Sequence, residues 1–425
     1  MSTLARAQEL DAQDPLAGFR EQFLEPEDGI VGYLDGNSLG RPPKATAERL
    51  QELVTQAWGT RLIRSWDEQW MRWPEETGDM IASAALGAAP GQTVVGDSTT
   101  VMLYKLARAA VDAQAGRTEI VLDTDNFPTD RYVLEGIAAE RGLTLRWIDT
   151  DPESGIHPEQ VAEAVGPNTA LVAFSHVAYR SGFLADAAAI TQIAHDAGAL
   201  VLWDLCHSVG SVPVELDAWD VDLAVGCTYK FLNGGPGAPA FGFVSARLQD
   251  RLRQPIWGWM GRKDPFHMAH GYVPADGIRG MVSGTPPIVG MLGVRVGVEM
   301  LAEAGIEAVR RKSLQLTDFA LEIVDSWPAD LRVRVASPRE HARRGGHITI
   351  RREDFRDVNE ELWRRGVIPD FREPDGIRIG LAPLSTSFEE VFTSMQVIHD
   401  VVTERKIAET GPARETDERK VEATA

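Results

Sequence analysis

The chain has 425 residues, of which 44% are hydrophobic and 25% charged, as is usual for a soluble globular protein of two or three domains. Its net charge of −20 argues against nucleic acid or an anionic membrane as the main partner, because both attract positively charged surfaces. We find no apolar run long enough to span a bilayer and no secretory signal, and the only cysteines are Cys206 and Cys227. These features predict a cytoplasmic protein without a disulfide framework.

Short apolar runs alternate with helical patterns from about residue 92 to 245. The runs are 118–123, 143–149, 169–177, 199–205 and 223–229, and the helical stretches include 130–142 and 186–199. Such alternation predicts an α/β fold in which a mostly parallel sheet is covered by helices. Ligands bind at the carboxyl ends of the strands in such sheets. The polar residues that fall near these ends are Asp130, Ser175, Asp204 and Lys230.

An irregular stretch rich in Gly, Pro, Trp and Met follows, from about residue 253 to 290. Loops of this length inside compact domains are usually functional or disordered, and the aromatic content favours function. From residue 288 a helical segment continues to 316, and a new pattern of strands and helices extends to about 400. The predicted division is an N-terminal segment associated with the small domain (1–45), a large domain (46–290), a small C-terminal domain (291–405) and a mobile, charged tail (406–425).

Lys230 is notable because the chain uses arginine for most of its basic side chains. Lysine stands only at positions 44, 105, 230, 263, 312, 406 and 420. A lone lysine at a strand end usually reaches solvent, but here Tyr229 adjoins it, glycines follow it, and Asp204 ends another strand, with His207 three positions later. Pyridoxal phosphate requires an amine for a Schiff base, an acid for its pyridinium nitrogen and a ring that stacks on it.

The phosphate of that cofactor would need hydroxyls and backbone N–H groups at the start of a helix. The string GDSTTVMLYKLARAAV, residues 96–111, supplies Ser98, Thr99 and Thr100 directly before an apolar helical run. Read alone, this string is an ordinary helix N-cap. In combination with Lys230 and Asp204 it predicts pyridoxal phosphate as the cofactor. No metal site is predicted.

Longer strings resemble those of the kynureninase family. They are YLDGNSLGRPP (33–43), NFPTDRYV (126–133), WDLCHSVGSVPVEL (203–216), GCTYKFLNGGPGAPAF (226–241) and SGTPPI (283–288), within a resemblance that runs from about residue 30 to 400. The resemblance implies an aspartate-aminotransferase-like (fold type I) enzyme whose large domain, a mostly parallel sheet flanked by helices, is joined to a smaller C-terminal α+β domain. It also implies hydrolysis of the Cβ–Cγ bond of L-kynurenine to anthranilate and L-alanine, in tryptophan catabolism.

The resemblance implies roles for individual residues. Lys230 would form the Schiff base, Asp204 would pair with the pyridinium nitrogen, and Tyr229 would move a proton or serve only as a hydrogen-bond partner of the phosphate. The cofactor-binding positions that it implies are Thr99, Thr100, Phe127, Pro128, Thr129, Asp130, Ser175, Asp204, His207, Tyr229, Lys230, Trp259 and Thr285. Trp259 and Thr285 match positions that reach the phosphate of the other subunit, so a homodimer with shared active sites is implied. The implied substrate-binding residues are Arg378, for the α-carboxylate, with Trp66 and Ser38.

Several alternatives stay open at this point. Trp66 and the Gly-Thr pair at 284–285 follow the bacterial pattern and favour kynurenine over 3-hydroxykynurenine. Arg262 stands where the family commonly has histidine, which leaves open a specialised homologue in a secondary-metabolite pathway. A transaminase, a desulfurase and a non-enzymatic binding protein of the same fold are further alternatives. A desulfurase would need a cysteine on a mobile loop, whereas both cysteines lie in strand-like motifs, and the presence of Lys230 argues against a protein that has lost catalysis.

Overall fold

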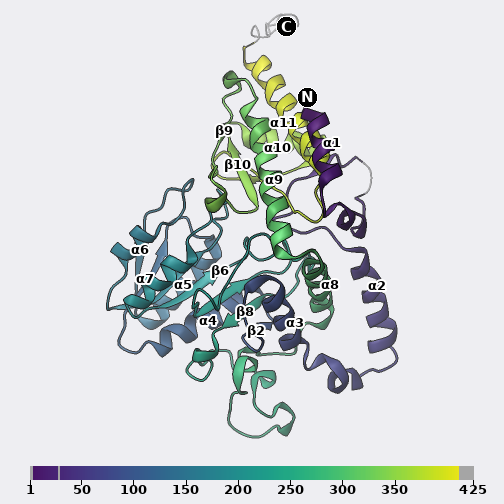
Figure 1. Cartoon of the computed structure of the whole chain (residues 1–425). Helices are drawn as coiled ribbons and strands as arrows, with labels where there is room; N and C mark the ends of the chain where they lie inside the picture. Colours follow the sequence, from purple (N-terminus) through teal and green to yellow (C-terminus); the bar gives the residue numbers. More distant parts are fainter. Residues whose placement is uncertain (1–2, 27–28, 411–425) are drawn as a thin grey trace, which may run out of the picture.

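The structure is a computed structural model that describes residues 3–26 and 29–410. The predicted mobile tail begins at residue 406, but residues 406–410 belong to the last helix, and residues from 411 on lie outside the described residues. A large body built on a seven-stranded sheet carries a smaller body built on a four-stranded sheet (Figure 1). No helix in the described part of the chain is long and apolar enough to cross a membrane.

The large sheet confirms the predicted α/β class. Its strand order is β2-β8-β7-β6-β5-β3-β4, and every pair from β7 to β4 is parallel, whereas β8 is antiparallel to both of its neighbours. The strands are β2 (Thr93–Val95), β3 (Glu119–Asp123), β4 (Thr144–Ile148), β5 (Thr169–Ser175), β6 (Leu200–Asp204), β7 (Leu223–Gly226) and β8 (Phe241–Val244). Each of the five predicted apolar runs contains one of them.

Helices cover both faces of this sheet, because neighbouring residues of a buried strand point to opposite sides. Val172 and Phe174 of β5 join one hydrophobic core, and Leu171 and Ala173 join the other. The helices α4 (Thr99–Ala113) and α5 (Pro128–Arg141) pack into the second core, and α3 (Trp73–Ile81), α6 (Pro158–Ala164) and α7 (Ala187–Asp196) pack into the first.

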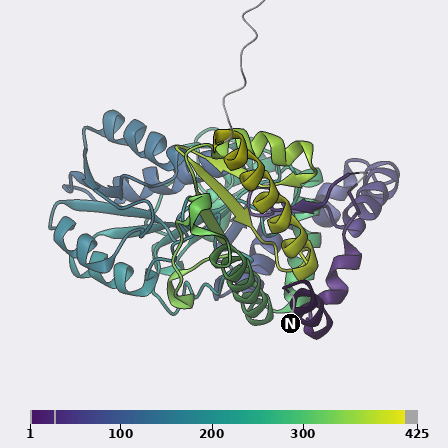
Figure 2. The same ribbon diagram turned by 90° about the horizontal axis from the view of Figure 1, so that it is seen from above.

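The small body has its own core and an antiparallel sheet of order β12-β13-β10-β9. Its elements are α9 (Ile306–Asp325), β9 (Arg334–Val335), β10 (His347–Arg351), α10 (Phe355–Arg364), β11 (Val367–Ile368), β12 (Asp370–Arg372), β13 (Gly376–Gly380) and α11 (Phe388–Thr410). The N-terminal segment packs against it, since α1 (Thr3–Gln13) lies on α11 and β1 (Gly32–Tyr33) pairs with β11. Seen from above, α11 crosses the middle of the molecule, with residues 100–200 on one side and α2 (Lys44–Glu52) on the other (Figure 2).

The helical stretch predicted from 288 to 316 consists of two helices, α8 (Ile288–Ala304) and α9, separated by Gly305. Gly305 has a φ of +76°, which a residue with a side chain adopts only at a cost. The buried residues of α8 belong to the core of the large body, so packing favours a domain boundary near Gly305, later than the proposed 290/291.

Short 3-10 and π-helical turns are Ala17–Gln22, Leu53–Trp58, Trp66–Trp70, Ala82–Leu86, Ala246–Leu248, Trp259–Gly261, Pro265–His267, Gly277–Met281, Ala329–Leu331 and His341–Arg343.

Candidate active site

The carboxyl ends of β5 and β6 bring Ser175 and Asp204 side by side, because these two residues are paired in the parallel register. The hydroxyl of Ser175 lies 3.4 Å from Oδ2 of Asp204 and 3.0 Å from Oδ1 of Asn126. The backbone N–H of Cys206 donates to Oδ1 of Asp204 over 2.8 Å. The buried carboxylate of Asp204 is therefore held in one orientation at the strand end.

A second carboxyl group, Asp130, faces Asp204 from the first turn of α5. Phe127 is the N-cap residue of this helix, and Pro128 and Thr129 open it, so all four residues of the predicted motif lie at one helix start. Burial, and next the charge of Asp204, raises the pKa of Asp130 well above its usual value. The protonated form of Asp130 is favoured as a result, which removes the repulsion between two negative charges beside Asp204.

Lys230 lies past the end of β7 and is 8% exposed. Its Nζ lies 3.1 Å from Nε2 of His207 and 6.0 Å from the centre of the Phe127 ring. The N-terminal motif passes close by, since the N–H of Gly40 donates to the carbonyl of Tyr229 over 2.8 Å. A Cβ at Gly40 would lie 2.4 Å from the carbonyl oxygen of Lys230, so only glycine fits there.

His207 connects the lysine to Arg378. Its Nε2 lies 3.1 Å from Nζ of Lys230 and 3.4 Å from Nη1 of Arg378. Burial, and next the charges of these two residues, holds the pKa of His207 well below its usual value, so the ring is neutral. Nε2 is assigned as the acceptor because both neighbours are donors.

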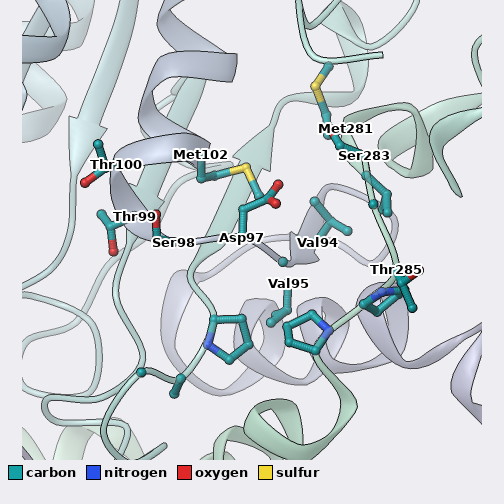
Figure 3. A pocket seen from close by; sticks show the side chains of 18 of the residues that line it. Val94, Val95, Asp97, Ser98, Thr99, Thr100, Met102, Met281, Ser283 and Thr285 are labelled. Atoms are coloured by element: carbon teal, nitrogen blue, oxygen red, sulfur yellow. The ribbon is translucent and has the colours of Figure 1, made fainter. Parts of the chain in front are cut away.

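The N-terminus of α4 forms one wall of a cavity of about 420 Å³ (Figure 3). Ser98 is the N-cap residue, and its hydroxyl accepts from the N–H of Val101 over 3.4 Å. Thr99 and Thr100, in the first turn, and Tyr229 also line the cavity. The start of α4 therefore places hydroxyls and free N–H groups where an anion is stabilised, and Tyr229 on the cavity wall directly precedes Lys230.

Arg378, on β13 of the small body, is the predicted carboxylate-binding residue and is 1% exposed. Its Nη2 donates to the hydroxyl of Ser38 over 2.6 Å and lies 2.7 Å from Oδ2 of Asp370. Its Nη1 donates to the carbonyl of Tyr179 over 2.8 Å. Burial lowers the pKa of Arg378 to about 10. The structure thus brings Arg378 and Ser38 together with His207 and Lys230.

Trp66 is not part of that group. It lines a separate cavity of about 270 Å³ together with Trp259, Phe266 and Thr285. Thr285 lines this cavity as well as the one at the start of α4. The resemblance implies that Trp66 binds substrate and that Trp259 and Thr285 reach the other subunit. The structure places these three residues together, away from Arg378.

Sequence reasoning missed four residues of this site. Asn126 accepts from the N–H of Phe127 over 2.8 Å, and the ring of Tyr179 packs edge-on against Phe127 with centroids 5.3 Å apart. Both follow predicted strands, so their position was a usable signal. Asp370 faces Arg378 only because β12 pairs with β13, and the buried His347 lies 5.6 Å from the His207 ring. The local sequence contains no signal for these two contacts.

Two further predictions need correction or comment. Cys206 and Cys227 are buried and unbridged, but they lie just beyond β6 and β7 and not within the strands. Arg262 donates to the carbonyls of Gly271 and Asp264. The Arg262 guanidinium thus links two parts of the loop that follows Trp259.

Comparison with known proteins identifies close relatives. The family described as Aminotransferase class-V matches residues 32–368. A kynureninase of Pseudomonas fluorescens is 42% identical over 407 residues, which is 94% of this chain and 95% of the relative. A kynureninase of Burkholderia pseudomallei is 41% identical over 409 residues, covering 95% and 96% of the two chains.

Solved structures share the fold at low identity. The cysteine desulfurase of Thermococcus onnurineus superposes with a TM-score of 0.79 at 20% identity, over 91% of this chain and 98% of its own. The cysteine desulfurase CsdA of Escherichia coli gives 0.79 at 17% identity, over 92% and 98%. These likenesses show the type of fold.

Proposed function

Because the chain belongs to the kynureninases, within the class-V aminotransferase family, we propose that the site around Lys230 performs their reaction. The enzyme is a pyridoxal-phosphate-dependent hydrolase that cleaves the Cβ–Cγ bond of L-kynurenine, giving anthranilate and L-alanine. The observation that carries the proposal is the position of the buried Lys230 amine, 3.1 Å from His207 and 6.0 Å from the Phe127 ring centre, at the same sheet edge as Asp204.

The residues present fit pyridoxal phosphate. Lys230 supplies the amine that would hold the cofactor, and the carboxylate of Asp204 would accept a hydrogen bond from the ring nitrogen. The phosphate would lie at the start of α4, among Ser98, Thr99 and Thr100, which line the 420 Å³ cavity. When bound, the cofactor supplies an electron sink for the charge that develops on the substrate carbons.

Each residue then has a defined task. Arg378, positioned by Asp370 and Ser38, would bind the substrate α-carboxylate through two parallel hydrogen bonds. The Lys230 amine would take the proton from Cα, since the neutral His207 beside it adds no positive charge. Tyr229 would transfer protons near the phosphate. Water adds to the γ-carbonyl, and collapse of the hydrate releases anthranilate.

The alternative reactions are less well supported. The desulfurases among the structural neighbours are only 17–20% identical, which supports the fold and not the reaction. Both cysteines of this chain are buried next to strand ends, where neither can swing out to meet a substrate. Of the two aryl substrates, kynurenine is favoured, because Trp66 and Thr285 share one aromatic cavity.

We further propose that the enzyme is a cytoplasmic homodimer. Four apolar side chains around Trp259, those of Ile63, Trp257, Phe266 and Met268, are each more than half exposed. An apolar surface of this kind usually marks an interface. A second subunit placed there would bring Trp259 and Thr285 to the edge of the neighbouring site. Two unbridged cysteines are typical of a reducing compartment.

The first test is the release of fluorescent anthranilate from L-kynurenine by the purified, cofactor-loaded protein. Lys230→Ala should release none, whereas Lys263→Ala, at an exposed lysine, should match the parent. Parent protein that binds pyridoxal phosphate but releases no anthranilate would refute the proposed reaction.

Shared sites are tested by complementation. Lys230→Ala and Thr285→Ala dimers should each be impaired, but refolding the two chains together should restore activity, because one site of the mixed dimer has both residues intact. If each subunit has a self-contained site, the mixture gives only the mean of the separate activities.

A further inference from the structure

The only two cysteines of the chain are neighbours in space. Asp204 of β6 is paired with Val225 of β7 in the parallel register, and the N–H of Leu205 donates to Val225 O over 2.8 Å. Cys206 and Cys227 follow where this ladder ends, so the two residues lie side by side just past the ends of neighbouring strands.

The contacts between the two residues are direct. The N–H of Cys227 donates to Sγ of Cys206 over 3.2 Å, and Sγ of Cys227 lies 3.8 Å from the carbonyl oxygen of Cys206. Each sulfur thus lies against the backbone of the other residue. The two thiols are unbridged.

The pair is built into the active site. Cys206 donates its N–H to the carboxylate of Asp204 over 2.8 Å, and it directly precedes His207. Cys227 lies three residues before Lys230. Movement of the two sulfurs toward each other would therefore shift the backbone that orients Asp204 and Lys230.

Cys206 is the more exposed of the two residues. Cys206 is 8% exposed, the same fraction as Lys230, whose amine a cofactor and a substrate must both reach. Cys227 is 1% exposed, so Cys206 is the residue that solvent meets first.

We propose that Cys206 and Cys227 form a dithiol that hydrogen peroxide oxidises to a disulfide, and that this modification switches the enzyme off. The sulfur of one cysteine attacks the peroxide, the O–O bond breaks, and one water leaves. The sulfur of the other cysteine then displaces the hydroxyl from the resulting sulfenic acid as a second water, so that an S–S bond forms. The two thiols lose two electrons and two protons, and the peroxide is reduced to two molecules of water. The loss of activity, though not the modification, rests on the proposed function.

The experiment treats the holoenzyme with hydrogen peroxide without reductant and counts thiols after denaturation. Because the chain has two cysteines, the count should fall from two to zero per chain, and the protein should remain a single chain on a non-reducing gel. Anthranilate release should fall roughly 10- to 100-fold, since a misplacement of about 1 Å can cost about 100-fold, and dithiothreitol should restore both the activity and the thiols.

Cys206→Ala is the matched control. It retains one thiol, cannot form the bridge, and should lose none of its own untreated activity under the same treatment. The proposal is overturned if the parent keeps two thiols, if a disulfide links two chains, or if the variant is inactivated as fast as the parent. Since thiols are counted without substrate, an enzyme that is inactive on kynurenine before treatment would count against the proposed function alone.

Discussion

Replacing Asp97 by Asn would remove the carboxylate that faces the buried ammonium of Lys105. Nζ of Lys105, on α4, lies 2.8 Å from Oδ2 of Asp97, the residue that precedes the N-cap Ser98. The Lys105 side chain is 0% exposed, whereas that of Asp97 is 30% exposed. Asp97 has a φ of +56°, which Asn tolerates well, so the substitution changes mainly the charge.

The two partners should respond unequally. Asp97→Asn leaves a buried charge without a partner, which typically costs about 3–5 kcal/mol of unfolding free energy. Lys105→Met leaves a carboxylate that water still reaches, so its cost should be at most about 1 kcal/mol. The double variant should resemble Lys105→Met. Burial lowers the pKa of Lys105, so the penalty in Asp97→Asn should shrink as the pH rises and Lys105 loses its proton.

The assay is urea unfolding of the four proteins, followed by circular dichroism, with unchanged slopes required for comparison. Cofactor retention should fall in the same order, since Asp97 positions the start of α4. A larger loss of stability in Lys105→Met than in Asp97→Asn would refute the unequal response, as would a double variant as unstable as Asp97→Asn.

Three further substitutions follow from the structure. Arg378→Lys loses the planar pair of donors and should lower kcat/KM about 10- to 100-fold in steady-state kinetics, mainly through a higher KM. An unchanged KM would contradict the proposal that Arg378 binds the substrate α-carboxylate. His195 donates to Asp222 over 2.9 Å, and this hydrogen bond raises the pKa of His195. The stabilising effect of the charged His195 is therefore present below about pH 6.5 and is lost as the pH rises above the raised pKa. His195→Gln should accordingly destabilise the protein more at about pH 5.5 than at about pH 8.5 in thermal melts. Gly305→Ala places a Cβ in open space, but the φ of +76° and ψ of 129° lie in a region that glycine alone adopts readily, so the substitution should cost about 1–3 kcal/mol in urea unfolding, and no loss would exclude backbone strain.

The edge of the large sheet could be predicted from sequence because polar residues stand at or near the ends of the buried runs. Ser175 and Asp204 are the last residues of β5 and β6, Lys230 follows the neighbouring β7, and parallel strands end at the same edge. The surroundings of Arg378 could not be predicted in this way. Its partner Asp370 lies on another strand of an antiparallel sheet, and the register that brings them together depends on the packing of the whole small body.

The position of Trp66 illustrates a different limit. Its motif was recognised, but the cavity it lines is completed by Trp259 and Thr285, about 200 residues later in the chain. Neither helical spacing nor strand alternation relates such distant loops. The break at Gly305 was missed for a simpler reason: apolar residues continue through it at helical spacing, so the pattern indicates one helix where the backbone turns.

The N-terminal motif gives the molecule a mechanical property. Strand β1 is hydrogen-bonded to β11 in the small body. Seven residues after Tyr33, the N–H of Gly40 donates to the carbonyl of Tyr229 in the large body. A Cβ at Gly40 would lie 2.4 Å from the carbonyl oxygen of Lys230, so the two segments are in close contact. These few residues therefore link the two bodies directly beside Lys230. Any rotation of the small body relative to the large one would act through this link on the backbone at Tyr229, so the positions of the Arg378 guanidinium and of the Lys230 amine would change together.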